Sequence, residues 1–183
     1  MENQMNMKHP FDRFLFCPMC GSREFAANSP KSKRCGACGF ELFMNASAAN
    51  VALITNERGE LLVTRRKKDP ARGTLDLPGG FADPDETAEE GVMREVMEET
   101  GMSVVRVQYL FSLPNRYLYS GLSIPTLDMF FRCEVADTSD IKAMDDVAEC
   151  LWMPLEDINP ADFGLRSISE GVARFIEMKG ENT

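Results

Sequence analysis

The sequence predicts an α/β or α+β domain with a mixed β-sheet, preceded by a small cysteine-rich module. Two C-x-x-C pairs lie within the first 46 residues, and after them strand-like and helix-like runs alternate to the end of the chain. At 183 residues the chain is long enough for one full-sized domain and a small module. We therefore predict two domains, residues 1–46 and residues 47–183.

The composition is that of an ordinary globular protein, with 44% hydrophobic and 27% charged residues. No apolar run reaches the roughly 18 residues of a membrane helix, and the N-terminus has no apolar signal-peptide core. We therefore expect a cytoplasmic protein without a membrane partner. The net charge is −9, and residues 47–183 hold 14 basic and 25 acidic residues, which makes bulk binding to nucleic acid an unfavourable interpretation.

The cysteine-rich module contains Cys17, Cys20, Cys35 and Cys38. Each C-x-x-C pair lets two thiolates reach one ion from a tight turn, and four thiolates suit tetrahedral zinc. Two disulfides or a redox pair are the alternatives, and a cytoplasmic setting disfavours structural disulfides. We predict a structural zinc ribbon without catalytic chemistry, because four cysteines leave no open position on the metal. His9, the only histidine, is assigned no role.

After the module, residues 50–55 and 61–66 read as strands joined by a turn, which predicts a β-hairpin. Residues 76–81 are a Pro/Gly break before a helix. Later segments predict strands at 104–113, 126–135 and 150–155, a polar turn at 114–121, and a closing amphipathic helix at 165–179.

The central helix is predicted over residues 88–100. Thr87 and Glu90 fit a capping box at its start, and Gly101 is a natural stop at its end. A helical projection places apolar side chains on one face, which we take as the core face: Ala88, Val92, Met93, Val96 and Met97.

Three glutamates of this helix, Glu95, Glu98 and Glu99, form a stripe along the edge of that face. Like charges at these spacings repel one another, and a hard divalent cation with oxygen ligands removes the repulsion. Gly91 falls within the same stripe, where its missing side chain leaves room for the close approach of a loop or ligand. An ordinary solvated acidic face is the alternative.

The surrounding residues decide between these alternatives. Gly80, Glu86 and the run from Arg94 to Met102 match every fixed position of the Nudix box, and residues 48–179 resemble Nudix hydrolases. The resemblance implies an α/β/α sandwich with a mixed sheet. It also implies hydrolysis of a nucleoside diphosphate linked to another moiety.

The resemblance assigns roles to box residues. The Mg²⁺ or Mn²⁺ ligands would be Glu95, Glu98, Glu99 and a backbone carbonyl of Gly79 or Gly80. Glu86 and Arg94 would hold the loop–helix–loop together. A four-cysteine ribbon before such a domain resembles the NADH pyrophosphatase branch, which implies a further metal ligand at Glu149, upstream of Trp152. Of that branch's marker sequence, only Ser112 and Pro114 are present.

The mechanism that follows is attack by a metal-activated water, with Glu98, Glu99 or Glu149 as the general base. The products would be a nucleoside monophosphate and a phosphorylated partner. Candidate substrate contacts are Arg65, Arg66, Arg116 and Tyr117. ADP-ribose-like or NADH-like dinucleotides are the expected substrates.

Two other functions stay open, hydrolysis of nucleoside triphosphates and a non-catalytic Nudix-like binding module. The basic residues Lys31, Lys33 and Arg34 leave an RNA-linked substrate open, and a homodimer is a further hypothesis.

Overall fold

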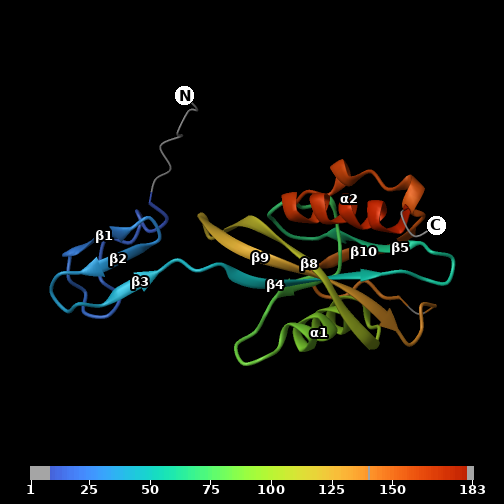
Figure 1. Ribbon diagram of the computed structural model, residues 1–183, viewed down its shortest axis with the longest axis horizontal. Helices are drawn as coiled ribbons and strands as arrows, with labels where there is room; N and C mark the ends of the chain where they lie inside the picture. The colour runs from blue at the N-terminus through green and yellow to red at the C-terminus, as the bar shows by residue number, and fades with distance from the viewer. Residues whose placement is uncertain (1–8, 140, 181–183) are drawn as a thin grey trace. The chain divides into compact units, whose positions relative to one another are not determined.

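The computed structural model describes residues 9–139 and 141–180. The chain divides into two compact units, which are described separately (Figure 1). The first unit contains the N-terminal segment up to Ala46 together with Leu118–Pro125. The second contains Ser47–Tyr117 and the chain from Thr126 onward. Neither helix of the described residues is long and apolar enough to cross a lipid bilayer.

The first unit is built on a three-stranded antiparallel sheet of β1 (Phe25–Ser29), β2 (Ser32–Cys35) and β3 (Glu41–Phe43). Phe25 packs with Cys17 and Cys35 in a small core. A core of this size gives little stabilisation, and such modules usually need a metal or disulfides.

Two polar residues, His9 and Lys33, connect residues 9–14 to this sheet. The His9 ring has Nε2 2.9 Å from the carbonyl oxygen of Ser29, and its Nδ1 accepts the N–H of Phe11. The Lys33 ammonium donates to the carbonyl oxygen of Phe14 at 2.7 Å and is buried. His9 therefore has a structural role that the sequence analysis did not assign, and Lys33 is not available to bind RNA.

The other strands form two sheets, which belong to the second unit except for the ends of two strands within Leu118–Pro125. The larger has the order β7 (Gly79–Phe81), β4 (Ser47–Ile54), β9 (Leu122–Val135) and β8 (Val104–Tyr119), and the smaller has the order β10 (Val147–Met153), β5 (Leu61–Arg66) and β6 (Leu75–Asp76). Strands β4 and β9 are parallel, whereas β4 and β7 are antiparallel. The sheet is therefore mixed, as predicted.

The predicted hairpin of residues 50–55 and 61–66 is wrong. Both segments are strands, but β4 and β5 belong to different sheets, and an isolated bridge between Thr55 and Leu61 stands in place of a hairpin ladder. Both edges of β4 are already paired, one with β7 and one with β9. The predicted polar turn at 114–121 is also mostly strand, and the chain reverses at Ser120 and Gly121, which both have positive φ.

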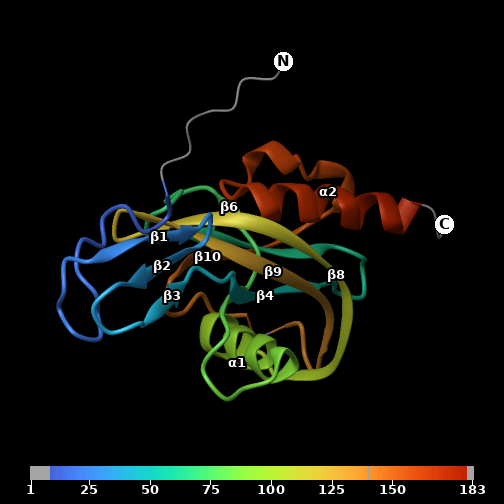
Figure 2. The ribbon, with the colours of Figure 1, turned by 60° about the vertical axis from the view of Figure 1, so that its left-hand side comes forward.

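Helices α1 (Ala88–Thr100) and α2 (Arg166–Gly180) cover opposite faces of the sheets, which gives the α/β/α sandwich (Figures 1 and 2). Alternate residues of β4 follow this division: Leu53 joins the core under α2, and Ala52 and Ile54 join the core under α1. Two short 3₁₀ helices, Leu155–Asp157 and Pro160–Asp162, precede α2.

Helix α1 begins and ends where predicted. Glu90 N–H donates to the Thr87 hydroxyl, the Glu90 carboxylate accepts the Thr87 N–H, and Gly101 closes the helix with φ 73°. The predicted core face was rotated, because Met93 and Met97 are exposed. The buried face instead includes Gly91 and Glu99 beside Val92 and Val96, so it carries part of the acidic stripe into the protein.

Candidate active site and metal centre

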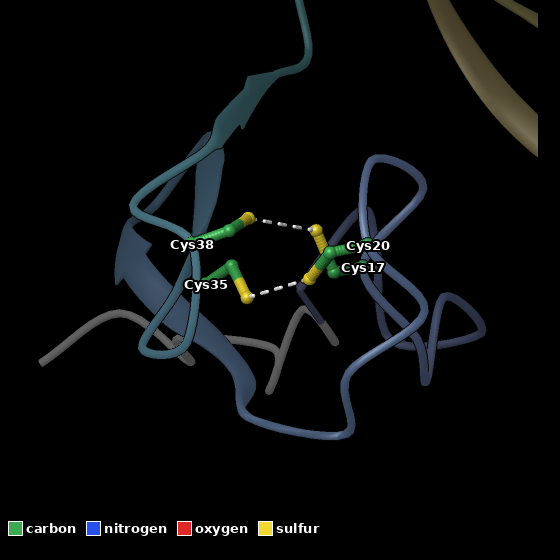
Figure 3. Close-up of side chains that lie close together, drawn as sticks. All are labelled: Cys17, Cys20, Cys35 and Cys38. Atoms are coloured by element: carbon green, nitrogen blue, oxygen red, sulfur yellow. Dashed lines mark hydrogen bonds between the residues drawn. The ribbon is translucent and has the colours of Figure 1, made fainter.

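The four cysteines of the first unit converge on one point (Figure 3). All their sulfur atoms lie within 4.8 Å of one another, and the Cys17–Cys38 and Cys20–Cys35 Sγ–Sγ distances are both 3.7 Å. Four thiolates about 2.3 Å from a tetrahedral zinc would be about 3.8 Å apart. The sulfur cage therefore fits a zinc ion in size and in chemistry.

The backbone of the cysteine turns supports this cage. Gly21 and Gly39 follow the second cysteine of each pair with φ of 75° and 77°, which glycine adopts without a steric penalty. The backbone N–H groups of Cys38 and Ala37 lower the pKa of Cys35 to about 7, against its partial desolvation. The backbone around Cys35 thus favours its thiolate form, which is the form that binds metal. The Ser22 backbone lowers the pKa of Cys20, but hydrogen bonds with the neighbouring cysteine side chains and desolvation outweigh this effect and raise that pKa to about 12.

In the second unit, the Arg94 guanidinium lies among three carboxylates of the Nudix-box segment. It donates to Glu86 Oε1 at 2.8 Å, to Glu95 Oε1 at 2.9 Å and to Glu98 Oε2 at 3.1 Å, and it also reaches the carbonyl oxygen of Phe81. The hydrogen bonds to Glu86 are the main reason that the pKa of Arg94 is raised, and those of Glu95 and Glu98 add to it. Arg94 thus balances the acidic stripe with its own positive charge.

Glu99 lies deeper than the other glutamates. Its side chain is buried, and Oε2 accepts the backbone N–H of Gly79 at 3.0 Å. Desolvation raises the pKa of Glu99 to about 8, and the negative charges of Glu95 and Asp76 add to the increase. A cation beside Glu99 would lower this pKa again, because opposite charge favours the ionised carboxylate.

Glycines shape the wall of this site. A Cβ on Gly80 would lie 2.4 Å from Glu95 Oε1, so only a glycine lets the carboxylate pack against the backbone here. A Cβ on Gly79 would lie 2.1 Å from the carbonyl oxygen of Asn50. The Gly79–Gly80 backbone is therefore held between β4 and the carboxylates of α1, where an oxygen-binding cation needs its ligands.

The three glutamates of the stripe do not converge as closely as the cysteines. Among the described residues, only the four cysteines form a set of three or more metal-binding atoms within 4.8 Å of one another. Arg94 holds Glu95 and Glu98, while the Gly79 N–H holds Glu99. The possible ligands are carboxylate oxygens beside backbone carbonyls, which are the ligand types that suit Mg²⁺ or Mn²⁺. A bound cation would replace the hydrogen bonds that Arg94 donates to Glu95 and Glu98.

Glu149 lies on β10, beside Cys150. Its carboxylate accepts a hydrogen bond from Arg65 Nε at 3.0 Å, across the β10–β5 pairing. Burial raises the pKa of Cys150 to about 11, and the charges of Glu99 and Glu149 both contribute. Glu149 and Glu99 therefore lie near the same thiol, although Glu149 makes no hydrogen bond to the box residues.

The candidate substrate residues have different surroundings. The Arg66 guanidinium is half-buried, forms an ion pair with Asp76, and donates to the Tyr117 hydroxyl at 3.2 Å. Arg65 also donates to the carbonyl oxygen of Gly73 at 3.0 Å. Arg116 is exposed and forms no ion pair with any residue that the structure describes.

Sequence reasoning missed two buried polar residues near the site. Asp76 is buried, and its negative charge contributes to the raised pKa of Glu99. Desolvation raises the pKa of Asp76 itself despite the ion pair with Arg66. Asn50 is buried next to Gly91. The only sequence signal for Asn50 was its position as a polar residue at the edge of an apolar strand. Nothing in the sequence distinguished Asp76 from an ordinary turn residue.

The family profile described as NUDIX domain matches residues 44–172. The chain belongs to the Nudix family. A protein from Deinococcus radiodurans named NAD-capped RNA hydrolase NudC is 31% identical over 146 residues, which cover 78% of this chain and 50% of that protein. A protein of the same name from Stutzerimonas stutzeri is 28% identical over 144 residues, covering 78% and 49%. The chain thus spans about half the length of these relatives.

Solved Nudix structures agree in fold. A NUDIX hydrolase from Nitrosomonas europaea has a TM-score of 0.70 with 24% identity, covering 91% of this chain and 92% of that one. The NUDIX domain of Shewanella oneidensis NrtR, solved with ADP ribose, has a TM-score of 0.58 with 21% identity, covering 76% and 90%. The α/β/α sandwich predicted from the Nudix box is confirmed.

The buried Glu99 of the Nudix box predicts a pH dependence of stability. Its pKa is about 8 in the folded protein and 4.5 ordinarily, so between these values the folded state keeps a proton that the unfolded state releases. The free energy of unfolding should therefore fall as pH rises through this window. We expect the melting temperature, in buffer without Mg²⁺ or Mn²⁺, to be lower at about pH 8 than at about pH 5.

Two controls isolate Glu99 in that measurement. Glu99→Gln should lose less stability over the same pH range, because glutamine does not titrate. Added Mg²⁺ should raise the melting temperature more at the higher pH, where the carboxylate is available. An identical pH profile for the wild type and Glu99→Gln would contradict the assignment.

Proposed function

We propose that this Nudix domain hydrolyses the phosphoanhydride of a nucleoside diphosphate linked to another moiety, such as ADP-ribose or an NADH-like dinucleotide. The observation that carries the proposal is the placement of the box glutamates. Glu95 packs on Gly80, and Glu99 is buried against Gly79, so carboxylates and backbone carbonyls gather at one end of β7. Carboxylate oxygens there match the ligands that Mg²⁺ uses when it binds substrate phosphates.

In this mechanism, Glu95, Glu98 and Glu99 would hold Mg²⁺ or Mn²⁺, with a backbone carbonyl of Gly79 or Gly80. When bound, such ions polarise a phosphoryl oxygen and lower the pKa of a water molecule. Glu98 is the carboxylate best placed to accept the water's proton, because its side chain is 50% exposed whereas those of Glu95 and Glu99 are largely buried. Glu149 is the alternative base.

Arg94 would keep the box carboxylates in place before the cation arrives. Its contacts with Glu86 would persist, and those with Glu95 and Glu98 would be given up to the metal. The Glu86–Arg94 pair would then fix the loop before α1 against the helix, which is the structural role proposed for both residues.

The nucleoside would bind beside an aromatic pair next to the box. Phe81 and Tyr117 meet edge to face with ring centroids 5.4 Å apart, and Phe81 is 39% exposed. Arg66 holds the Tyr117 hydroxyl, so the pair is fixed in orientation. Exposed aromatic rings stack on nucleobases. The guanidinium of Arg116, which has no ion-pair partner among the described residues, suits a phosphate. The relatives' name and the ADP-ribose complex of the NrtR domain support a substrate of this class.

Residues 1–46 would form a structural zinc ribbon. Residues 47–183 would form the hydrolase domain. Thiolates held for zinc are compatible with the reducing cytoplasm, which we propose as its location. That the protein forms a homodimer, and that it accepts an RNA-linked substrate, stay predictions.

A substrate panel tests the proposal. Purified protein with Mg²⁺ or Mn²⁺ is assayed against NADH, NAD, ADP-ribose, diadenosine polyphosphates and nucleoside triphosphates, with products resolved by chromatography. We expect metal-dependent release of a nucleoside monophosphate from a dinucleotide or from ADP-ribose. Pyrophosphate release from triphosphates alone would favour the triphosphate pyrophosphohydrolase, and no turnover of any compound would favour a binding module.

A further inference from the structure

Asn50 is a buried polar residue without a partner. Its side chain is 1% exposed, and neither its amide nitrogen nor its amide oxygen has a hydrogen-bond partner among the described residues. Buried polar groups are almost always paired, since an unpaired one costs folding free energy. An unpaired amide at this depth therefore points to a role beyond packing.

The surroundings of the amide belong to the Nudix box. A Cβ on Gly91 would lie 2.3 Å from Asn50 Nδ2 and 2.7 Å from Glu86 Oε1, so the amide and the carboxylate both lie against the bare backbone of α1. The backbone of Asn50 is also the register partner of Gly80 across the β4–β7 pairing. Asn50 therefore contacts two parts of the Nudix box, helix α1 through its side chain and strand β7 through its backbone.

Glu86 has capacity for another donor. Oε1 accepts the Asp83 N–H at 2.6 Å and one Arg94 nitrogen, whereas Oε2 accepts only Arg94 Nε, at 3.1 Å. An ionised carboxylate offers about four acceptor positions. The amide nitrogen of Asn50 is a donor with no acceptor, on the same side of α1.

We propose that Asn50 is a positioning residue for the divalent-cation site, and that position 91 is glycine to admit its amide beside Glu86. Asn50 Nδ2 has no partner among the described residues, and it would donate to Glu86 only when the cation is bound. Glu86 orients Arg94 through two hydrogen bonds, and Arg94 contacts Glu95 and Glu98. Partners beyond the ligands typically change metal affinity when they are removed. The inference rests on the proposed cation site and adds a residue outside the box that sets its affinity.

Asn50→Leu separates positioning from stability. Leucine has nearly the same size, and replacing an unpaired buried polar group with an apolar one is neutral or stabilising. We expect an unchanged or raised melting temperature, together with a Mn²⁺ dissociation constant raised about tenfold, measured from free Mn²⁺ by electron paramagnetic resonance. Val92→Ala, which removes apolar packing beside Gly91, is the control: it should lower the melting temperature and leave Mn²⁺ affinity unchanged.

A double-mutant cycle tests the contact itself. Gly91→Ala should weaken Mn²⁺ binding, because the new methyl group would lie 2.3 Å from Asn50 Nδ2 and 2.7 Å from Glu86 Oε1 and must push one or both of them away. Asn50→Ala removes one of these two close contacts, so Gly91→Ala should weaken Mn²⁺ binding less in the Asn50→Ala background than in the wild type. Additive losses would overturn the proposed coupling.

The outcomes also separate this inference from the proposed function. If the wild type binds Mn²⁺ and Asn50→Leu and Asn50→Ala bind it equally well, the positioning role is overturned and the cation site stands. If the wild type binds no Mn²⁺ outside the cysteine cluster, both are overturned.

Discussion

Glu98→Gln should lower kcat by about two to four orders of magnitude on whichever dinucleotide the enzyme hydrolyses, because it removes a metal ligand and the proposed base. The side chain is half-exposed and its described partner is Arg94, so the fold should be unaffected. Steady-state kinetics and a thermal melt of the same preparation measure both effects. Glu99→Gln should cause a comparable loss of kcat without lowering the melting temperature at about pH 8, since it removes a buried charge.

Glu89→Gln is the matched control for these variants. Glu89 lies on the same helix, is exposed, and makes no ion pair with any residue that the structure describes. The substitution changes the charge equally but lies away from the site, so kcat should stay within about twofold of the wild type. A Glu98→Gln enzyme as active as Glu89→Gln would contradict the role of Glu98.

Cys35→Ser should abolish zinc binding and unfold the first unit. Structural zinc contributes roughly 10 kcal/mol or more to such modules, and the core of Cys17, Phe25 and Cys35 is too small to replace it. Metal analysis should find about one zinc ion per wild-type chain and none in the variant. Limited proteolysis should then cleave the ribbon within residues 9–46 and leave the second unit resistant.

The control for that experiment is Cys150→Ser. Cys150 lies on β10 of the second unit and is not part of the four-sulfur cage, so zinc content should not change. Zinc retained by Cys35→Ser, or a zinc-free wild type with an intact ribbon, would contradict the structural role of the cysteines.

Local sequence signals predicted the elements that depend on local physics. The capping box at Thr87 and the stop at Gly101 fixed α1 correctly, because helix ends are decided by hydrogen bonds within a few residues. The C-x-x-C spacing likewise predicted a sulfur cage, since each pair is confined to one turn.

Features that depend on long-range pairing were not predictable. Strands β4 and β5 look like a hairpin in sequence, but β9, whose residues lie 79 positions after their partners in β4, takes an edge of β4. The core face of α1 was predicted from hydrophobicity alone, and this placed Met93 inward. Hydrophobicity could not reveal that the buried Asn50 lies against Gly91, or that the Gly79 backbone binds Glu99. The resemblance implied that Glu86 and Arg94 hold the loop–helix–loop together, but nothing in the sequence indicated that Arg94 would also contact Glu95.

The central claim is that the α1 carboxylates bind the divalent cation. Crystals soaked in Mn²⁺ test it directly through an anomalous-difference map. We expect a peak bonded to oxygens of Glu95, Glu98 and Glu99, with Arg94 moved off Glu95 and Glu98 but still paired with Glu86. A map without a peak at α1, in which Arg94 keeps its hydrogen bonds to Glu95 and Glu98, would contradict the account.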